Sequence, residues 1–320
     1  MRIVAQVNGA ALLCMLCSCA TILDQDAALA TAPFYIENSG RIVIEAHVND
    51  RGPFEFALDT AASISLIFDD LRHALELQPL EGGEVIIHGA VESGRFPLVT
   101  VARISIGAEV WSNVPIVVMP RETQTDSTID GILGIDFLSR YAVGFSSQDG
   151  VVRLYAPDLL RHRSYRGWTA IPLSPQRIGT SNASLYFFDI EIRRRKIRSV
   201  FDLGAGLNVL NWHAARSVGM QPNSDRFTAS DPVIGITGSA AKVSMLNVEE
   251  VTTGSVTWHN EKFLIGDLGI FALFEMSEGP AAIVGAGMFT RRDFIIDFVR
   301  NRLLINVAGA EAARVDIESH

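Results

Sequence analysis

The chain has 320 residues, of which 48% are apolar, and a formal net charge of −9. A single hydrophobic core stops growing at roughly 250 residues, so a chain of this length can hold two lobes. The few basic clusters, such as residues 193–196, are short and carry no interleaved aromatic residues. Composition and charge therefore argue against a nucleic-acid-binding protein.

The N-terminus has the features of an export signal. All three cysteines precede Ala20, so the rest of the chain can form neither an internal disulfide nor a thiolate metal site. Arg2 is followed by a mostly apolar stretch, residues 3–16, that is too short to span a bilayer. These features predict a signal peptide that is removed on export.

Two cleavage schemes fit this segment. The run Leu16-Cys17-Ser18-Cys19-Ala20 resembles a bacterial lipoprotein box, which implies a signal peptide over residues 1–18 and a lipid on Cys19. The alternative is ordinary cleavage after Ala30, because Ala28-Leu29-Ala30 satisfies the small-x-small rule. Both schemes place the mature protein in the periplasm, and the first also anchors it in the outer membrane.

Short β-rich runs separated by Gly, Pro, Asn or Asp dominate from Phe34 onward and predict an all-β fold. In the first half these runs are residues 42–44, 54–58, 84–87 and 114–118. Helical periodicity is confined to residues 69–77, 137–141 and 212–218, which predicts short accessory helices.

An internal repeat organises the chain. A hairpin over residues 44–58 runs directly into Asp59, and a hairpin over residues 188–201 runs directly into Asp202. Farther on, each copy reaches two apolar residues and a glycine, at residues 132–134 and 283–285. Two homologous lobes are the simplest explanation of this shared order.

The repeat sets the predicted domain boundaries. The first lobe covers residues 33–156 and the second covers residues 170–308. The intervening residues 157–169 have little periodicity and are interpreted as the interlobe linker, and residues 309–320 as a C-terminal tail.

The two acidic turns are the candidate catalytic groups. A single Asp followed by small residues is a common turn, but Asp59 and Asp202 each follow an apolar strand-like run that brings the carboxyl near a core. If the lobes meet about a pseudo-two-fold axis, the two carboxyl groups face each other and share one proton, because like charges so close cannot both ionise. One carboxylate could then take a proton from water while the other donates a proton.

These motifs resemble a known family. Asp59-Thr60-Ala61-Ala62-Ser63 is similar to the Asp-Thr/Ser-Gly/Ala-Ala motif of bacterial retropepsin-like aspartic proteases, and Ile132-Leu133-Gly134 is similar to their apolar-apolar-Gly segment. Asp202-Leu203-Gly204-Ala205 and Ile283-Val284-Gly285 resemble a second copy. The resemblance implies a bilobal, pepsin-like acid protease fold and an aspartic endopeptidase that needs no cofactor.

The resemblance also implies roles for the surrounding residues. Thr60 would support the carboxyl pair through its hydroxyl group, and the hairpin at His88 and Gly89 would close over the substrate as a flap, with Gly238 at the matching position of the second lobe. The residues implied to support the catalytic loops are Thr60, Ala61, Ala62, Leu203, Gly204 and Ala205. Those implied to lace beneath the loops are Ile132, Leu133, Gly134, Ile283, Val284 and Gly285.

Leu203 departs from the family pattern, which has Thr or Ser at this position. Two alternatives follow: an active enzyme with an asymmetric carboxyl pair, which we favour because both acids and both glycine segments remain, or a second lobe that has become a scaffold. A non-catalytic peptide-binding module and a homodimeric protease that uses only Asp59 are the corresponding rival hypotheses. The monomeric enzyme is the primary prediction.

Other chemistries find little support in the sequence. The seven histidines are too dispersed for a recognisable metal site, so no metal is expected. Asp136 and Asp297 follow the two glycine segments and are interpreted as capping or turn residues. The expected partners are extended polypeptides, in particular other envelope proteins, with no nucleic acid and no membrane contact beyond the lipid anchor.

Overall fold

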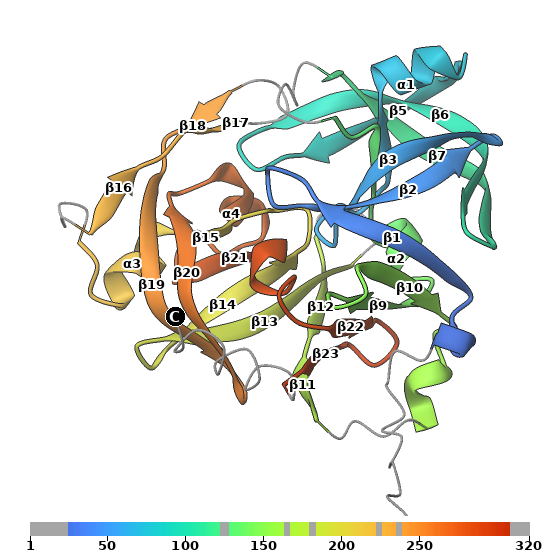
Figure 1. Ribbon diagram of the computed structural model, residues 1–320. Helices are drawn as coiled ribbons and strands as arrows, with labels where there is room; N and C mark the ends of the chain where they lie inside the picture. Colours follow the sequence, from blue (N-terminus) through green and yellow to red (C-terminus); the bar gives the residue numbers. More distant parts are fainter. Residues whose placement is uncertain are drawn as a thin grey trace, which may run out of the picture.

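The computed structural model describes residues 25–121, 128–162, 167–178, 184–221, 226–234 and 239–307. Two β-rich lobes lie side by side above a shared group of strands, as Figure 1 shows. Cys19, Gly238 and the tail at residues 309–320 lie outside the described residues, so the predictions made for them stay predictions.

The first lobe is built from seven strands of a 13-stranded sheet whose order is β11-β23-β22-β9-β10-β1-β2-β3-β8-β4-β7-β6-β5. The predicted hairpin at residues 44–58 is confirmed as an antiparallel pair with a β-bulge near its turn. The seven strands are β2 (Ile42–Val48), β3 (Arg51–Leu58), β4 (Leu66–Phe68), β5 (Pro79–His88), β6 (Ser93–Ile106), β7 (Glu109–Met119) and β8 (Gly131–Leu133).

The second lobe repeats this plan in an eight-stranded sheet whose order is β12-β13-β14-β21-β15-β20-β19-β16. Its strands are β12 (Ser174–Arg177), β13 (Ser184–Ile192), β14 (Arg195–Asp202), β15 (Asn208–Leu210), β16 (Phe227–Ala229), β19 (Ser244–Thr253), β20 (Val256–Ile265) and β21 (Ala281–Gly285). A separate two-stranded ribbon is formed by β17 (Val233–Ile234) and β18 (Ala240–Ala241).

The lobes are joined by strands that both halves of the chain contribute. The joining strands are β1 (Ala30–Ile36), β9 (Ala142–Ser146), β10 (Val151–Tyr155), β11 (Trp168–Pro172), β22 (Phe294–Asp297) and β23 (Arg302–Asn306). The closing strand β22 pairs with β9 of the first half, and the ring of Phe145 stacks on that of Phe294 with centroids 4.2 Å apart. The closing strands of the two copies therefore form one continuous interlobe sheet (Figure 1).

The helices are short, as predicted. They are α1 (Asp69–Ala74), α2 (Ile135–Leu138), α3 (Trp212–Ser217) and α4 (Gly269–Leu273), with 3-10 turns η1 (Gln25–Ala27), η3 (Leu159–His162) and η4 (Ala286–Met288). The sequence did not predict α4, because its five residues, Gly-Ile-Phe-Ala-Leu, include no polar residue that would mark an exposed helix face. Asn211 caps α3 by accepting a hydrogen bond from the Ala214 amide at 2.8 Å.

Alternating burial along the strands explains why they fold as they do. In β2 the burial pattern places Ile44, Ala46 and Val48 in the interior, with Glu45 and His47 outside. Strands nearer the middle of the molecule are buried on both faces, as β21 and β22 are throughout. Within the described part of the chain, no helix has the length and apolarity needed to cross a membrane.

Candidate active site

The two acidic turns occupy equivalent places at the ends of β3 and β14. Each strand runs parallel to its glycine segment, with Leu58 beside Leu133 in one lobe and Asp202 beside Gly285 in the other. The Asp59 amide donates to the Leu133 carbonyl at 3.0 Å. Parallel pairing at the strand ends holds each acidic turn at the inner edge of its lobe.

Each carboxylate is held by the backbone of its own loop. Oδ1 of Asp59 accepts hydrogen bonds from the amides of Ala61 at 2.7 Å and Ala62 at 2.8 Å. Oδ1 of Asp202 accepts them from Gly204 at 2.9 Å and Ala205 at 3.1 Å. The loop residues named by the sequence analysis therefore fix the carboxylates through main-chain donors.

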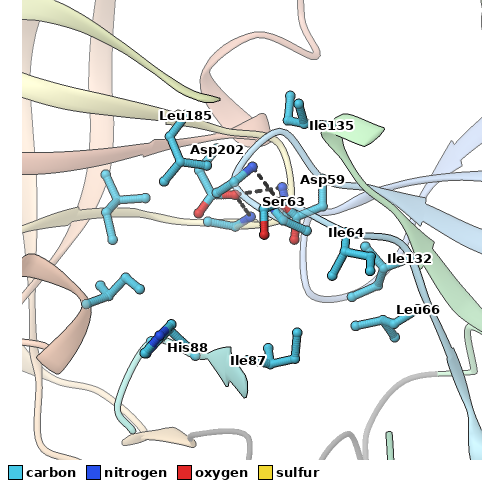
Figure 2. Close-up of a pocket in the computed structure, with 18 of the residues that line it drawn as sticks. Asp59, Ser63, Ile64, Leu66, Ile87, His88, Ile132, Ile135, Leu185 and Asp202 are labelled. Atoms are coloured by element: carbon cyan, nitrogen blue, oxygen red, sulfur yellow. Dashed lines mark hydrogen bonds between the residues drawn. The ribbon is translucent and has the colours of Figure 1, made fainter. Parts of the chain in front are cut away.

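The two carboxyl groups meet between the lobes. A Cβ placed on Gly204 would lie 2.2 Å from the Asp59 carboxyl carbon, so the Asp59 side chain reaches against the second catalytic loop. The two carboxyl groups lie within hydrogen-bonding reach of each other. Figure 2 shows Asp59 and Asp202 side by side.

The electrostatics of the two acids differ. Burial raises the pKa of Asp59, while its two amide donors and the positive charge of Arg41 oppose that rise. Burial raises the pKa of Asp202 well above its ordinary range, and the negative charge of Asp59 raises it further. A pair in which one member keeps a proton that the other releases is suited to acid-base chemistry.

Thr60 links the two lobes at this point. Its hydroxyl donates to the Phe201 carbonyl at 2.8 Å and accepts from the Leu203 amide at 2.9 Å, so it brackets Asp202 from the opposite lobe. Both Thr60 and Leu203 are fully buried. The Leu203 side chain supplies packing but no hydroxyl group, so this support runs in one direction only.

The glycine segments lace beneath the acidic turns in both lobes. The Ile135 amide donates to the Ala62 carbonyl at 2.8 Å, and the Ala286 amide donates to the Ala205 carbonyl at 2.8 Å. The other segment residues, Ile132 and Ile283, line the cleft itself, while Val284 is buried in the core.

Two supporting residues escaped the sequence analysis. Gly134 donates its amide hydrogen to the Ser65 hydroxyl at 3.0 Å, and Gly285 donates its own to Oδ1 of Asn208 at 2.9 Å. Both side chains are buried, and each stands six residues after the acid of its own lobe, Asp59 or Asp202. This shared spacing could have predicted the two residues from the sequence. It is hard to recognise because one residue is Ser and the other is Asn.

A cleft of about 1480 Å³ runs between the lobes over the acid pair. Its walls are mostly apolar, and His88 and Gly89, the residues predicted to form a flap, line it together with Ala90. The His88 ring hydrogen-bonds the Ser93 hydroxyl at 2.6 Å across the hairpin. In Figure 2 His88 and Ile87 lie across the cavity from the two acids.

The tip of this hairpin, residues 89–92, reaches the second lobe. The Ile270 amide of α4 donates to the Ala90 carbonyl at 3.1 Å. A Cβ on Gly269 would lie 2.3 Å from the Val91 carbonyl oxygen, so the contact requires a residue without a side chain. The hairpin therefore spans the cleft from one lobe to the other.

The remaining acidic candidates have other partners. Asp136 accepts hydrogen bonds from the Ser65 amide and hydroxyl at 2.9 and 2.7 Å, which fixes the residue that supports Gly134. Asp297 is fully buried and paired with Arg300 and Arg302. Among the described residues, no group of three or more His, Cys, Asp or Glu side chains could hold a metal ion.

Comparison with known protein families finds a match in the first lobe. Residues 44–137 match the family model described as aspartyl protease. Over this segment the first lobe is similar to aspartyl proteases. The matched segment contains both Asp59 and the Gly134 segment, so the predicted resemblance is confirmed for this lobe. No curated protein matches the chain.

The fold comparison extends over both lobes. Conglutin gamma, a basic 7S globulin from lupine seeds, aligns with a TM-score of 0.51 at 11% sequence identity, covering 89% of this chain and 96% of that one. At this identity the likeness concerns the fold alone. It confirms the predicted all-β, bilobal, pepsin-like architecture for nearly the whole chain.

Proposed function

We propose that the protein is an aspartic endopeptidase in which Asp59 and Asp202 activate one water molecule. The observation that carries this proposal is the meeting of two carboxyl groups, one from each lobe, in a single cleft. The ionised acid takes a proton from the water, and the water oxygen attacks the peptide carbonyl carbon. The protonated acid hydrogen-bonds the developing oxyanion and helps protonate the leaving nitrogen.

The cleft supports an extended polypeptide as the substrate. His88 of the β5–β6 hairpin lies across the cavity from Asp59 and Asp202, so a chain laid between the hairpin and the acids presents its backbone to the carboxyl groups. Apolar walls favour apolar substrate side chains beside the cleaved bond. Envelope proteins are the proposed source of these substrates, because the N-terminus has the pattern of an export signal.

Cleavage of an unstructured protein by the purified chain from acid to neutral pH tests this function. Asp59→Asn and Asp202→Asn should each lower kcat/KM by at least about 10²- to 10⁴-fold, the usual contribution of a positioned acid or base. Activity that survives in Asp202→Asn but is lost in Asp59→Asn would instead favour the homodimer that uses only Asp59.

A peptide-binding module without turnover is the second candidate. Leu203 favours it, because the second lobe lacks the hydroxyl that would reciprocate Thr60. This candidate expects that wild type binds unstructured peptides without cutting them and that Asp59→Asn binds them equally well. Turnover by wild type would exclude it.

We propose that a lipid on Cys19 attaches the protein to the outer membrane. The support comes from residues 29 and 30, which lie downstream of Cys19 and are part of the folded lobe. The Leu29 amide donates to the Leu154 carbonyl at 2.8 Å, and Ala30 is the buried first residue of β1. Cleavage after Ala30 would remove both, which favours processing at the lipoprotein box. The mass of the mature N-terminal peptide tests this: a lipid-modified Cys19, absent in Cys19→Ser, is expected, and a chain that begins at Thr31 would contradict it.

A further inference from the structure

The residues opposite the two catalytic acids differ between the lobes. In the first lobe Val43 of β2 pairs with Ala57 of β3, and continuing this register by two residues places Arg41 opposite Asp59. In the second lobe Phe187 pairs with Val200, and the same continuation places Leu185 opposite Asp202. All four side chains line the cleft, and the positive charge of Arg41 acts on Asp59. One acid therefore faces a cation and the other an apolar side chain.

The Arg41 side chain is held in place at the cleft. It lines the cleft together with Asp59, and only 9% of it is exposed. Its Nε donates to the carboxylate of Glu37, which is equally buried, and to the Ser39 hydroxyl at 3.0 Å. Because these bonds hold the Arg41 guanidinium in one position, its positive charge acts on the neighbouring Asp59 carboxyl from a constant direction.

The turn that carries Arg41 is clamped between the lobes. The Gly40 amide donates to the Glu37 carbonyl at 2.8 Å, which closes the turn. A Cβ on Gly206, just past the second catalytic loop, would lie 1.5 Å from the Ser39 carbonyl oxygen. The turn therefore rests on the loop of Asp202, and its position depends on the assembled pair of lobes.

We propose that Arg41 is a positioning residue that keeps Asp59 as the ionised member of the pair and leaves the proton on Asp202. The effect of Arg41 on turnover rests on the proposed function. The difference in charge between the two acids rests on the placement of Arg41 beside Asp59 and of Leu185 beside Asp202. A cation within a few ångströms of a desolvated carboxyl favours the charged form, whereas a leucine offers no such stabilisation. The asymmetry of the pair would then originate in the β1–β2 turn as well as in Leu203.

Asp59 has several charged neighbours besides Arg41. The groups in or beside the cleft are Arg41 and Glu37 of the β1–β2 turn, Asp202 of β14, Asp136 of α2 and His88 of β5. Of these, Glu37 is paired with Arg41 and Asp136 is bonded to Ser65. The test therefore changes both members of the Arg41–Glu37 pair.

The test compares Arg41→Leu, Arg41→Lys and Glu37→Gln with wild type in the full mature chain. The pH profile of kcat/KM should move to higher pH in Arg41→Leu, because Asp59 loses the charge that favours its ionised form. It should move to lower pH in Glu37→Gln, because the field of Arg41 is no longer opposed. A displacement of about half a unit, or about threefold in kcat/KM at the foot of the acid limb, is expected. Arg41→Lys should stay near wild type.

A readout without turnover separates this proposal from the proposed function. The carboxyl groups of Asp59 and Asp202 are titrated by NMR in protein carrying ¹³C-labelled aspartate, with Asp59→Asn for assignment. Opposite displacements in Arg41→Leu and Glu37→Gln are expected even if no peptide is cut. Displacements of the same sign, or equal losses of Tm with an unmoved titration, would overturn the proposal and leave Arg41 as a support of the turn.

Discussion

The buried hydroxyl of Thr60 occupies a position where small changes have large effects. It bonds main-chain groups on both sides of Asp202 in the opposite lobe. Thr60 and Leu203 are fully buried, so bulk water does not reach these groups to replace the hydroxyl. An unsatisfied buried donor or acceptor costs about 1–3 kcal/mol. The orientation of Asp202 therefore depends on a side chain of the other lobe.

Thr60→Val keeps the shape of the side chain but removes this hydroxyl. We expect the free energy of unfolding to fall by about 1–3 kcal/mol, because the Phe201 carbonyl and the Leu203 amide lose their partner. Turnover should fall as well, since the Asp202 loop is less firmly held. Chemical denaturation and kcat measure the two effects. Thr60→Ser is the control, and equal behaviour of the Val and Ser variants would contradict this role.

Among contacts between secondary-structure elements, the one that joins the β5–β6 hairpin to α4 connects the two lobes across the cleft. It is a single backbone hydrogen bond between Ile270 and Ala90, reinforced by the close approach of Gly269 to Val91. The helix α4 therefore positions the hairpin of the opposite lobe.

Gly269→Ala should displace the hairpin, because the new Cβ would lie 2.3 Å from the Val91 carbonyl oxygen. Loss of one hydrogen bond corresponds to about a 2- to 10-fold change, expected as faster hydrogen exchange at the Ile270 amide and a higher KM. Gly279→Ala is the matched control, since no atom lies within 4 Å of its Cβ position. Unchanged exchange at Ile270 in Gly269→Ala would count against the contact.

For the whole molecule, the acid pair couples stability to pH. Asp202 binds its proton more tightly in the folded protein than in the unfolded chain, because burial and Asp59 raise its pKa. Its contribution to stability is therefore fully present below the ordinary pKa of Asp and is lost as pH rises through the raised folded value. Each unit of difference contributes about 1.4 kcal/mol.

Asp202→Asn removes this loss, because the amide stays neutral at every pH. The variant should have a higher Tm than wild type at neutral pH, and the difference should shrink as pH falls toward the ordinary pKa of Asp. Thermal unfolding from acid to neutral pH measures it. A variant whose Tm is lower than that of wild type by the same margin at every pH would show that packing, not ionisation, dominates at this position.

Local pattern predicted the pair of acids that meet between the lobes. Asp59, Asp202 and the two glycine segments could be found because each is a contiguous run, a strand followed by an acid and small residues, and because the run is repeated. The start of α3 at Trp212 was also predicted, whereas α4 was missed. Ser65 and Asn208 were missed because their shared role lies in position and not in residue type.

The two lobes, their all-β character and the positions of the two acids could be predicted from local patterns, because strand alternation and the repeat are properties of short windows. The pairing of β22 with β9, the bond from Thr60 to Phe201, the placement of Arg41 near Asp59 and the contact of Ala90 with α4 could not be predicted in this way. Each of these depends on register or on packing between segments far apart in the chain. Such contacts form only when both lobes are assembled, so no local pattern records them.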